Sequence, residues 1–236
     1  MEELERVRRL HDTRQRSPDL AAALDCLARW QGRRLNATYA DLARDPRYAQ
    51  AIAFFGSDLY GPVDFSRRDA DLARVVPIMV RMLPEAVLAT VATAMELSAL
   101  SQELDRTLLR ELGDDTLSVP AYCAAYRACA NRPARKRQIA LIIDVGRALD
   151  RYVHKMFLRQ TLRLMRRPAK VAGLGALQHF LERGFTSFAG MRGADQFLET
   201  INARESALMD AIFAGDRAPF PDPLAKWAYS RAKRRP

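Results

Sequence analysis

The feature that most constrains the fold of this chain is a stripe of apolar residues in the segment from 134 to 156. Its members follow one another at spacings of three, four, three, four and three: Ile139, Ile142, Gly146, Leu149, Val153 and Met156. This spacing places all of them on one side of an α-helix and predicts a single core-facing stripe. The helical pattern continues toward Arg167, where Pro168 interrupts it.

Capping residues and prolines divide the rest of the chain into similar segments. Ser17 followed by Pro18 is typical of a helix start, and the helix after it is expected to end near Gly32. Ser118 and Pro120 give a second start of the same kind. These signals predict helices of ordinary length joined by short turns.

The longest predicted helix runs from Pro84 to about Leu112 and ends before a glycine. Between residues 87 and 100 its side chains are apolar almost all round, which predicts a buried central helix.

No segment alternates between apolar and polar residues for more than a few positions, so we expect no sheet. We predict an all-α fold, a bundle of about eight or nine helices. Residues 1–218 are expected to form a single helical domain, within which residues 1–60 form a possible N-terminal subdomain. Residues 219–236 read as a proline-rich arm and a basic tail.

The charge balance is strongly basic. Among 236 residues there are 38 lysines and arginines against 28 acids, a formal net charge of +10. This charge permits an acidic partner, such as nucleic acid or an anionic membrane surface, without requiring one. Because the acids are spread along the chain, a solvated or locally paired basic surface explains the charge equally well.

The cysteines and the N-terminal segment indicate the cellular compartment of the protein. The three cysteines show no zinc or redox spacing, so we expect reduced, buried thiols: Cys26, Cys123 and Cys129. The charged N-terminal segment is unlike a signal peptide, and the apolar run 86–100 is too short to span a bilayer. These observations predict a cytoplasmic protein without membrane contact.

An unusual stretch lies between residues 54 and 69, with the sequence FFGSDLYGPVDFSRRD. We single out its ionisable side chains as candidates for binding an anion or ligand: Asp58, Tyr60, Asp64, Arg67, Arg68 and Asp69. Two arginines at a helix N-terminus can bind a carboxylate or phosphate. Alternatively, the acids cap that helix, the arginines pair with the acids, and the aromatic residues fasten the turn to the core.

This stretch is part of a wider resemblance to known protein sequences. Together with LPEAVLATVATAMELSALSQELD, RQIALIIDVGRALDRYVHK and GALQHFLERGFTSF, it resembles a group of bacterial proteins of unknown function that share an FF-x-x-D-L-Y-G-P block. The resemblance covers roughly residues 50 to 215. It implies a bacterial, cytosolic, helical protein and assigns no catalytic residue.

Glu96 is an acid inside the long apolar helix. A buried carboxylate there requires a partner, most simply an arginine from another helix. One that faces a cavity would instead be a candidate ligand-binding group, acid or base. No histidine follows a glutamate by three residues, so we predict neither a metal site nor a cofactor. The histidines are interpreted as surface residues: His11, His154 and His179.

A basic stripe precedes and follows Pro168. Arg159, Arg163, Arg166 and Lys170 recur at spacings of four, three and four residues. Such a stripe is a candidate nucleic-acid contact on a helix. It is equally explained by a solvated face, or by ion pairs with Asp144 and Asp150.

The sequence therefore favours a non-enzymatic helical module that binds a protein partner or a small ligand, with a homodimer left open. A nucleic-acid-associated protein that uses the basic stripe is the first alternative, although nucleic acid is not the favoured partner. An enzyme or cofactor carrier with a cavity near Glu96 is the second.

Overall fold

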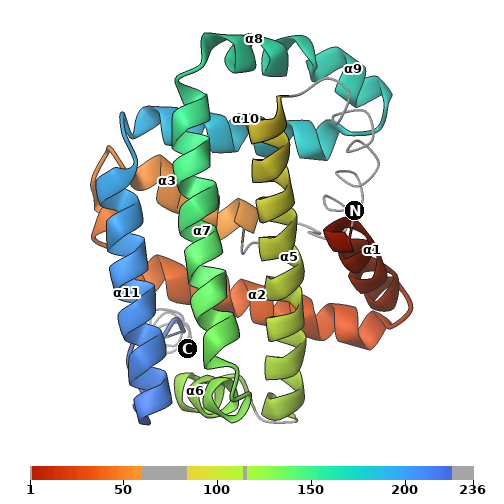
Figure 1. Ribbon diagram of the computed structural model, residues 1–236. Coiled ribbons are helices and arrows are strands. Elements are labelled where there is room, and N and C mark those ends of the chain that lie inside the picture. Colours follow the sequence, from red (N-terminus) through yellow and green to blue (C-terminus); the bar gives the residue numbers. More distant parts are fainter. Residues whose placement is uncertain (1, 60–83, 114–115, 225–236) are drawn as a thin grey trace, which may run out of the picture.

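The computed structural model describes residues 2–59, 84–113 and 116–224, and in these ranges the predicted all-α class is confirmed (Figure 1). No strand occurs in the described part. The helices are α1 (Glu2–Gln15), α2 (Pro18–Thr38), α3 (Ala49–Phe54), α5 (Glu85–Leu112), α6 (Val119–Ala128), α7 (Arg132–Val153), α8 (Met156–Leu164), α9 (Arg166–Val171), α10 (Gly175–Gly190) and α11 (Asp195–Ala214). Short turns of 3-10 and π type occupy Leu42–Arg44 and Phe55–Leu59.

Three long helices stand side by side and organise the fold. α7 lies between α5 and α11 and packs against both (Figure 1). α6 closes one end of this group, and α8 with α9 crosses the other end. α2, α3 and α10 cross the long helices, and α1 packs on the side of α5.

Two predicted helix starts have the expected capping geometry. The Ser17 hydroxyl accepts a hydrogen bond from the Leu20 amide, and the Ser118 hydroxyl accepts one from Ala121. The predicted end near Gly32 is wrong, because α2 continues to Thr38. A glycine inside a helix costs about 1 kcal/mol relative to alanine. We attribute the continuation to burial of the residues that follow, since Leu35 and Tyr39 lie in the core.

The helix that carries the apolar stripe of residues 139–156 also ends earlier than predicted. α7 ends at Val153, and Met156 begins a new helix, where it is 69% exposed instead of joining the core. The next break falls at Met165, before Pro168, which sits in the first turn of α9. Proline lacks an amide hydrogen, and its ring clashes with the carbonyl four residues earlier, so it fits a first turn and ends the preceding helix.

The interior contains two large apolar clusters. The first joins α2, α3, α7, α10 and α11 through buried side chains that include Tyr39, Phe54, Phe188 and Phe197. The second joins α2, α5, α6 and α11 around Trp30. α5 was expected to be the buried central helix, but it is largely half-exposed between residues 87 and 100, and α7 lies between α5 and α11 instead. In that segment only Met95 and Ala99 are buried, because α7 and α1 cover α5 on part of its circumference.

Candidate functional site

The unusual stretch is only partly described. Phe54 and Phe55 are buried in the first apolar cluster, with their rings edge to face at 6.2 Å between centroids. This agrees with the interpretation that the aromatic residues fasten the turn to the core. The candidate residues Tyr60, Asp64, Arg67, Arg68 and Asp69, and the side chain of Asp58, lie outside the described residues.

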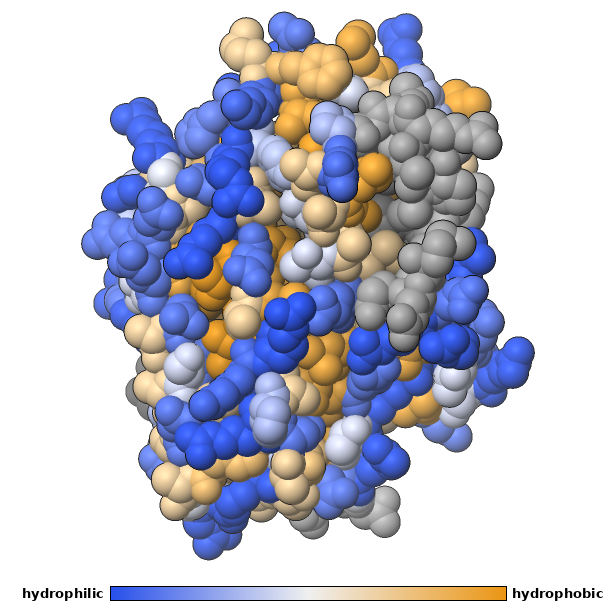
Figure 2. All heavy atoms as spheres, in the orientation of Figure 1, coloured by the Kyte–Doolittle hydropathy of each residue, from blue (hydrophilic) through white to orange (hydrophobic). Residues whose placement is uncertain are grey.

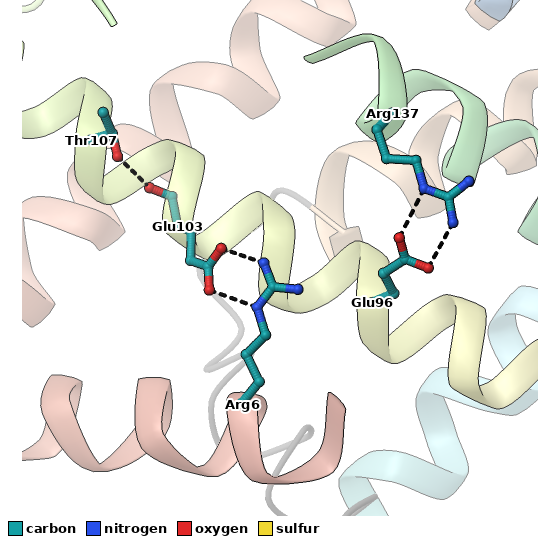
Figure 3. A network of polar contacts seen from close by, with 5 residues as sticks. All are labelled: Arg6, Glu96, Glu103, Thr107 and Arg137. Atoms are coloured by element: carbon teal, nitrogen blue, oxygen red, sulfur yellow. Dashed lines mark hydrogen bonds and ion pairs between the residues drawn. The ribbon is translucent and has the colours of Figure 1, made fainter. Parts of the chain in front are cut away.

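Glu96 is half-buried on α5 and is paired with an arginine from another helix. Its two carboxylate oxygens accept hydrogen bonds from Nε and Nη2 of Arg137 on α7, each at 2.8 Å (Figure 3). Two turns further along α5, Glu103 is held in the same two-point manner by Arg6 of α1. Both acids therefore join α5 to its neighbouring helices, which is the simpler of the two interpretations of Glu96.

The basic stripe does contribute to a pocket. Arg159 and Arg163 of α8 and Arg166 of α9 line a surface pocket of about 370 Å³, whereas Lys170 does not. The opposite walls come from α10 and α3. They add the polar residues Gln50, His179, Glu182, Arg183, Thr186 and Ser187 and the apolar residues Ala53, Phe185 and Ala189. Leu162 of α8 completes the apolar part of the lining.

The charges that line the pocket are unevenly paired. Arg166 Nε donates a hydrogen bond to Glu182 at 2.6 Å, and this bond lowers the pKa of the Glu182 carboxyl below its ordinary value. Arg183 Nη2 donates to the Ser57 hydroxyl at 3.1 Å. Within the part of the chain that the structure describes, the guanidinium groups of Arg159 and Arg163 have no hydrogen-bond or ion-pair partner. The expected alternative pairing with Asp144 and Asp150 is therefore not observed.

A set of polar contacts positions the two walls. The side-chain amide of Gln178, on α10, donates to the Leu162 carbonyl at 2.6 Å and to Glu182 at 2.9 Å. It thus satisfies a carbonyl near the end of α8 that has no partner inside the helix. The Leu174 amide donates to the Ala169 carbonyl at 2.7 Å. Gly173, with φ of +75°, makes the tight reversal between α9 and α10.

Sequence reasoning missed the α10 wall. The sequence pattern predicts that His179 is a surface residue, and it assigns no site role to Glu182 or Arg183. Each is separated from the basic stripe by the α9–α10 reversal, so helical spacing alone could not bring them together. The available signal was the glycine pair at residues 173 and 175, which predicts a short connection and therefore antiparallel neighbours.

A family model for a domain of unknown function, DUF8198, matches residues 10–219. The chain belongs to this family. The match begins at residue 10, whereas the resemblance noted in the sequence began near residue 50. No curated protein and no solved structure matches the chain.

Across the ranges 2–59, 84–113 and 116–224, no helix combines the length and the apolar content needed to cross a bilayer. In the same ranges, no group of three or more histidine, cysteine, aspartate or glutamate side chains is arranged to hold a metal ion. Of the thiols, Cys123 is buried, Cys129 is half-buried and Cys26 is exposed, so the expectation of buried thiols is wrong for Cys26.

Proposed function

We propose that this protein is a non-enzymatic helical module of the bacterial cytoplasm that binds a small anionic ligand in the pocket between α8, α9 and α10. The observation that carries the proposal is the pair Arg159 and Arg163. Both guanidinium groups line the pocket without a partner in the described residues. A planar guanidinium binds carboxylate or phosphate with two parallel hydrogen bonds, so two of them make a suitable anion site.

The rest of the lining suits a ligand with an apolar body. Leu162, Phe185 and Ala53 supply apolar surface, and Thr186 adds a hydroxyl. Ligand sites are commonly apolar with a few placed polar groups that fix orientation. We therefore expect phenyl phosphate to bind more tightly than inorganic phosphate, because only the former contributes a ring to the apolar part of the pocket.

Titration calorimetry with phenyl phosphate tests this proposal. The variant Arg159→Gln/Arg163→Gln should weaken binding about tenfold or more, since charge-assisted hydrogen bonds contribute about 1.5–3 kcal/mol each. The matched control is Arg29→Gln/Arg33→Gln, which removes two exposed arginines from α2, outside the pocket. Equal affinity in both variants, or no heat at about millimolar ligand, would refute the proposal.

A nucleic-acid-associated function is the second candidate, supported by the same two arginines. It predicts binding to duplex DNA or RNA that weakens steeply as salt increases, because phosphate contacts release counterions. An enzyme or cofactor carrier centred on Glu96 has less support, since Glu96 is paired with Arg137. Glu96 also lines neither the basic pocket nor a second pocket of about 290 Å³ next to Lys136 and Asp210.

A further inference from the structure

The end of the molecule formed by α8 and α9 carries a concentration of exposed apolar surface. In the described part of the chain, every large apolar side chain that is exposed lies in the segment 156–171. These side chains are Met156 (69% exposed), Phe157 (68%), Leu164 (78%), Met165 (46%) and Val171 (91%). Figure 2 shows orange and tan spheres at this end, beside blue ones. Exposed clusters of this kind mark interaction surfaces in soluble domains.

The same segment is strongly basic. Residues 151–181 contain seven lysines and arginines and no aspartate or glutamate. Most of these basic side chains on α8 and α9 are exposed, including Arg167 and Lys170, which do not line the pocket. Acidic partners for these side chains can therefore come only from outside this segment, as Glu182 does for Arg166.

Two of the exposed apolar side chains of α8 lie on a different side of the helix from the arginines that line the pocket. Phe157 and Leu164 are seven residues apart, which places them on one side of the helix, and neither lines the pocket. Leu158 and Leu162 are half-buried, and α8 packs on α10. Arg159 and Arg163 line the pocket. The apolar row is therefore free for contact even when the pocket is occupied.

We propose that the α8–α9 face, defined by the five exposed apolar residues and the adjacent Arg167 and Lys170, is a docking surface for an anionic lipid bilayer. A helix that combines exposed aromatic and aliphatic side chains with basic ones lies in the interface plane, with its apolar side chains among the acyl chains and its cations among the anionic headgroups. The surface contact does not require a spanning helix.

Charge and shape favour this occupant over the others. A second copy would bring the same basic face against itself, and like charges repel. Nucleic acid would match the arginines but would leave four of the five apolar side chains without a suitable contact, since only Phe157 can stack on a base. A partner helix usually docks into an apolar groove, and these side chains line neither of the two pockets described above.

This proposal revises the expectation of no membrane contact drawn from the sequence. That expectation rests on the charged N-terminal segment and on the short apolar run 86–100, although the net charge also permits contact with an anionic membrane surface. Because it treated residues 134–167 as one helix with a core stripe, it also placed Met156 in the interior. The turn between α7 and α8 instead exposes the start of α8.

Vesicle flotation of the full chain provides the test. We expect binding to vesicles of phosphatidylcholine mixed with phosphatidylglycerol at low salt and little binding to phosphatidylcholine alone. The variant Phe157→Ser/Leu164→Ser should weaken binding about tenfold or more, since each side chain contributes apolar burial worth about 1.5–3 kcal/mol when fully buried. Arg167→Gln/Lys170→Gln should weaken it to a smaller extent, and the distant control Arg29→Gln/Arg33→Gln should leave it nearly unchanged.

A reporter of insertion separates lipid contact from attraction of charge alone. The variant Phe157→Trp should show a blue shift and an increase in tryptophan emission with the anionic vesicles, and no shift with phosphatidylcholine. Failure of the native chain to bind anionic vesicles, or equal binding by Phe157→Ser/Leu164→Ser, would overturn the proposal. So would tighter binding to duplex DNA that the serine variant retains. Phenyl phosphate binding by the serine variant reports on the pocket separately, so the two proposals can fail independently.

Discussion

At the scale of single residues, Glu182 determines how much positive charge the pocket retains. Its carboxylate pairs with Arg166 at 2.6 Å, and that bond lowers its pKa, so it stays ionised throughout the neutral range. Glu182→Gln should therefore release Arg166 and tighten phenyl phosphate binding about threefold, the order expected for one exposed ion pair. Calorimetry measures the change.

The control for this prediction is Glu199→Gln on α11, which makes the same change in net charge outside the pocket. It should leave the affinity nearly unchanged. If Glu182→Gln weakens binding instead, then the acid positions Gln178 and the α8 end more than it neutralises Arg166.

Gly146 is a second residue with a specific role. A Cβ built at this position would lie 2.5 Å from Cδ2 of Leu198, which is 1% exposed in the core between α7 and α11. Gly146→Val should lower the free energy of unfolding by about 2 kcal/mol, because the core must repack around the added methyl groups. Urea unfolding gives the value.

Gly175→Val serves as the comparison, since a Cβ at Gly175 meets no atom within 4 Å. Its stability should stay within about 0.5 kcal/mol of the native chain. A similar loss in both variants would show that general helix effects, not the contact with Leu198, cause the change.

At the scale of elements, α2 and α11 are joined by a half-buried polar contact. Glu205 accepts hydrogen bonds from Arg34 Nη1 at 2.6 Å and from the Tyr39 hydroxyl at 2.9 Å. Glu205→Ala removes an acceptor that both groups share and should cost about 2 kcal/mol, less than the 3–5 kcal/mol typical of a fully buried pair. Asp210, on α11 like Glu205, forms an exposed pair with Arg132 of α7. Asp210→Ala breaks this pair and should cost about 0.5 kcal/mol or less. Denaturant unfolding of the two variants compares them directly.

The elements also show how far sequence reasoning reached. Local chemistry predicted the helical class and the starts at Ser17 and Ser118, because capping depends on neighbouring residues alone. The end of α7 was not predictable in this way, since His154 and Lys155 are neither proline nor glycine. The stripe continued in register to Met156, yet the chain turns there, and tertiary packing of α8 on α10 decides the outcome.

The candidate site, like the helices, was predictable from the sequence only in part. Helical spacing grouped Arg159, Arg163, Arg166 and Lys170 as one stripe. The first three line one wall of the same pocket, whereas Lys170 does not, and the stripe is divided between α8 and α9. The other wall depends on how α10 and α3 pack against that wall, and helical spacing carries no information about such packing. His179 illustrates the difference, because its position off the core stripe is compatible with open solvent and with a pocket lining alike.

At the scale of the whole molecule, stability in acid depends on carboxyls that pair with arginines. Arg204 donates two hydrogen bonds to Asp41 at 2.8 and 2.6 Å, and they lower the pKa of this carboxyl far below its ordinary value. Glu182 is shifted in the same direction by Arg166. Asp105 is shifted oppositely, because burial raises its pKa and outweighs the effect of Arg135.

The sign of the pH dependence follows from these directions. A carboxyl with a lowered folded pKa adds stability that is complete above its unfolded pKa of about 4. This stability is lost as pH falls through the folded value. We therefore expect the melting temperature of the native chain to fall below about pH 4. Asp105 acts in the opposite direction and at higher pH, because the stability gained by protonating its buried carboxyl is already complete once pH has fallen to the unfolded pKa of about 4. Asp41→Asn should reduce this fall in melting temperature at low pH, as scanning calorimetry over a pH series can measure.

The control is Asp12→Asn, at an exposed side chain that pairs with no residue of the described ranges. It should keep the dependence of melting temperature on pH that the native chain shows. If it flattens the curve equally, the acid response comes from total charge instead of the pair with Arg204.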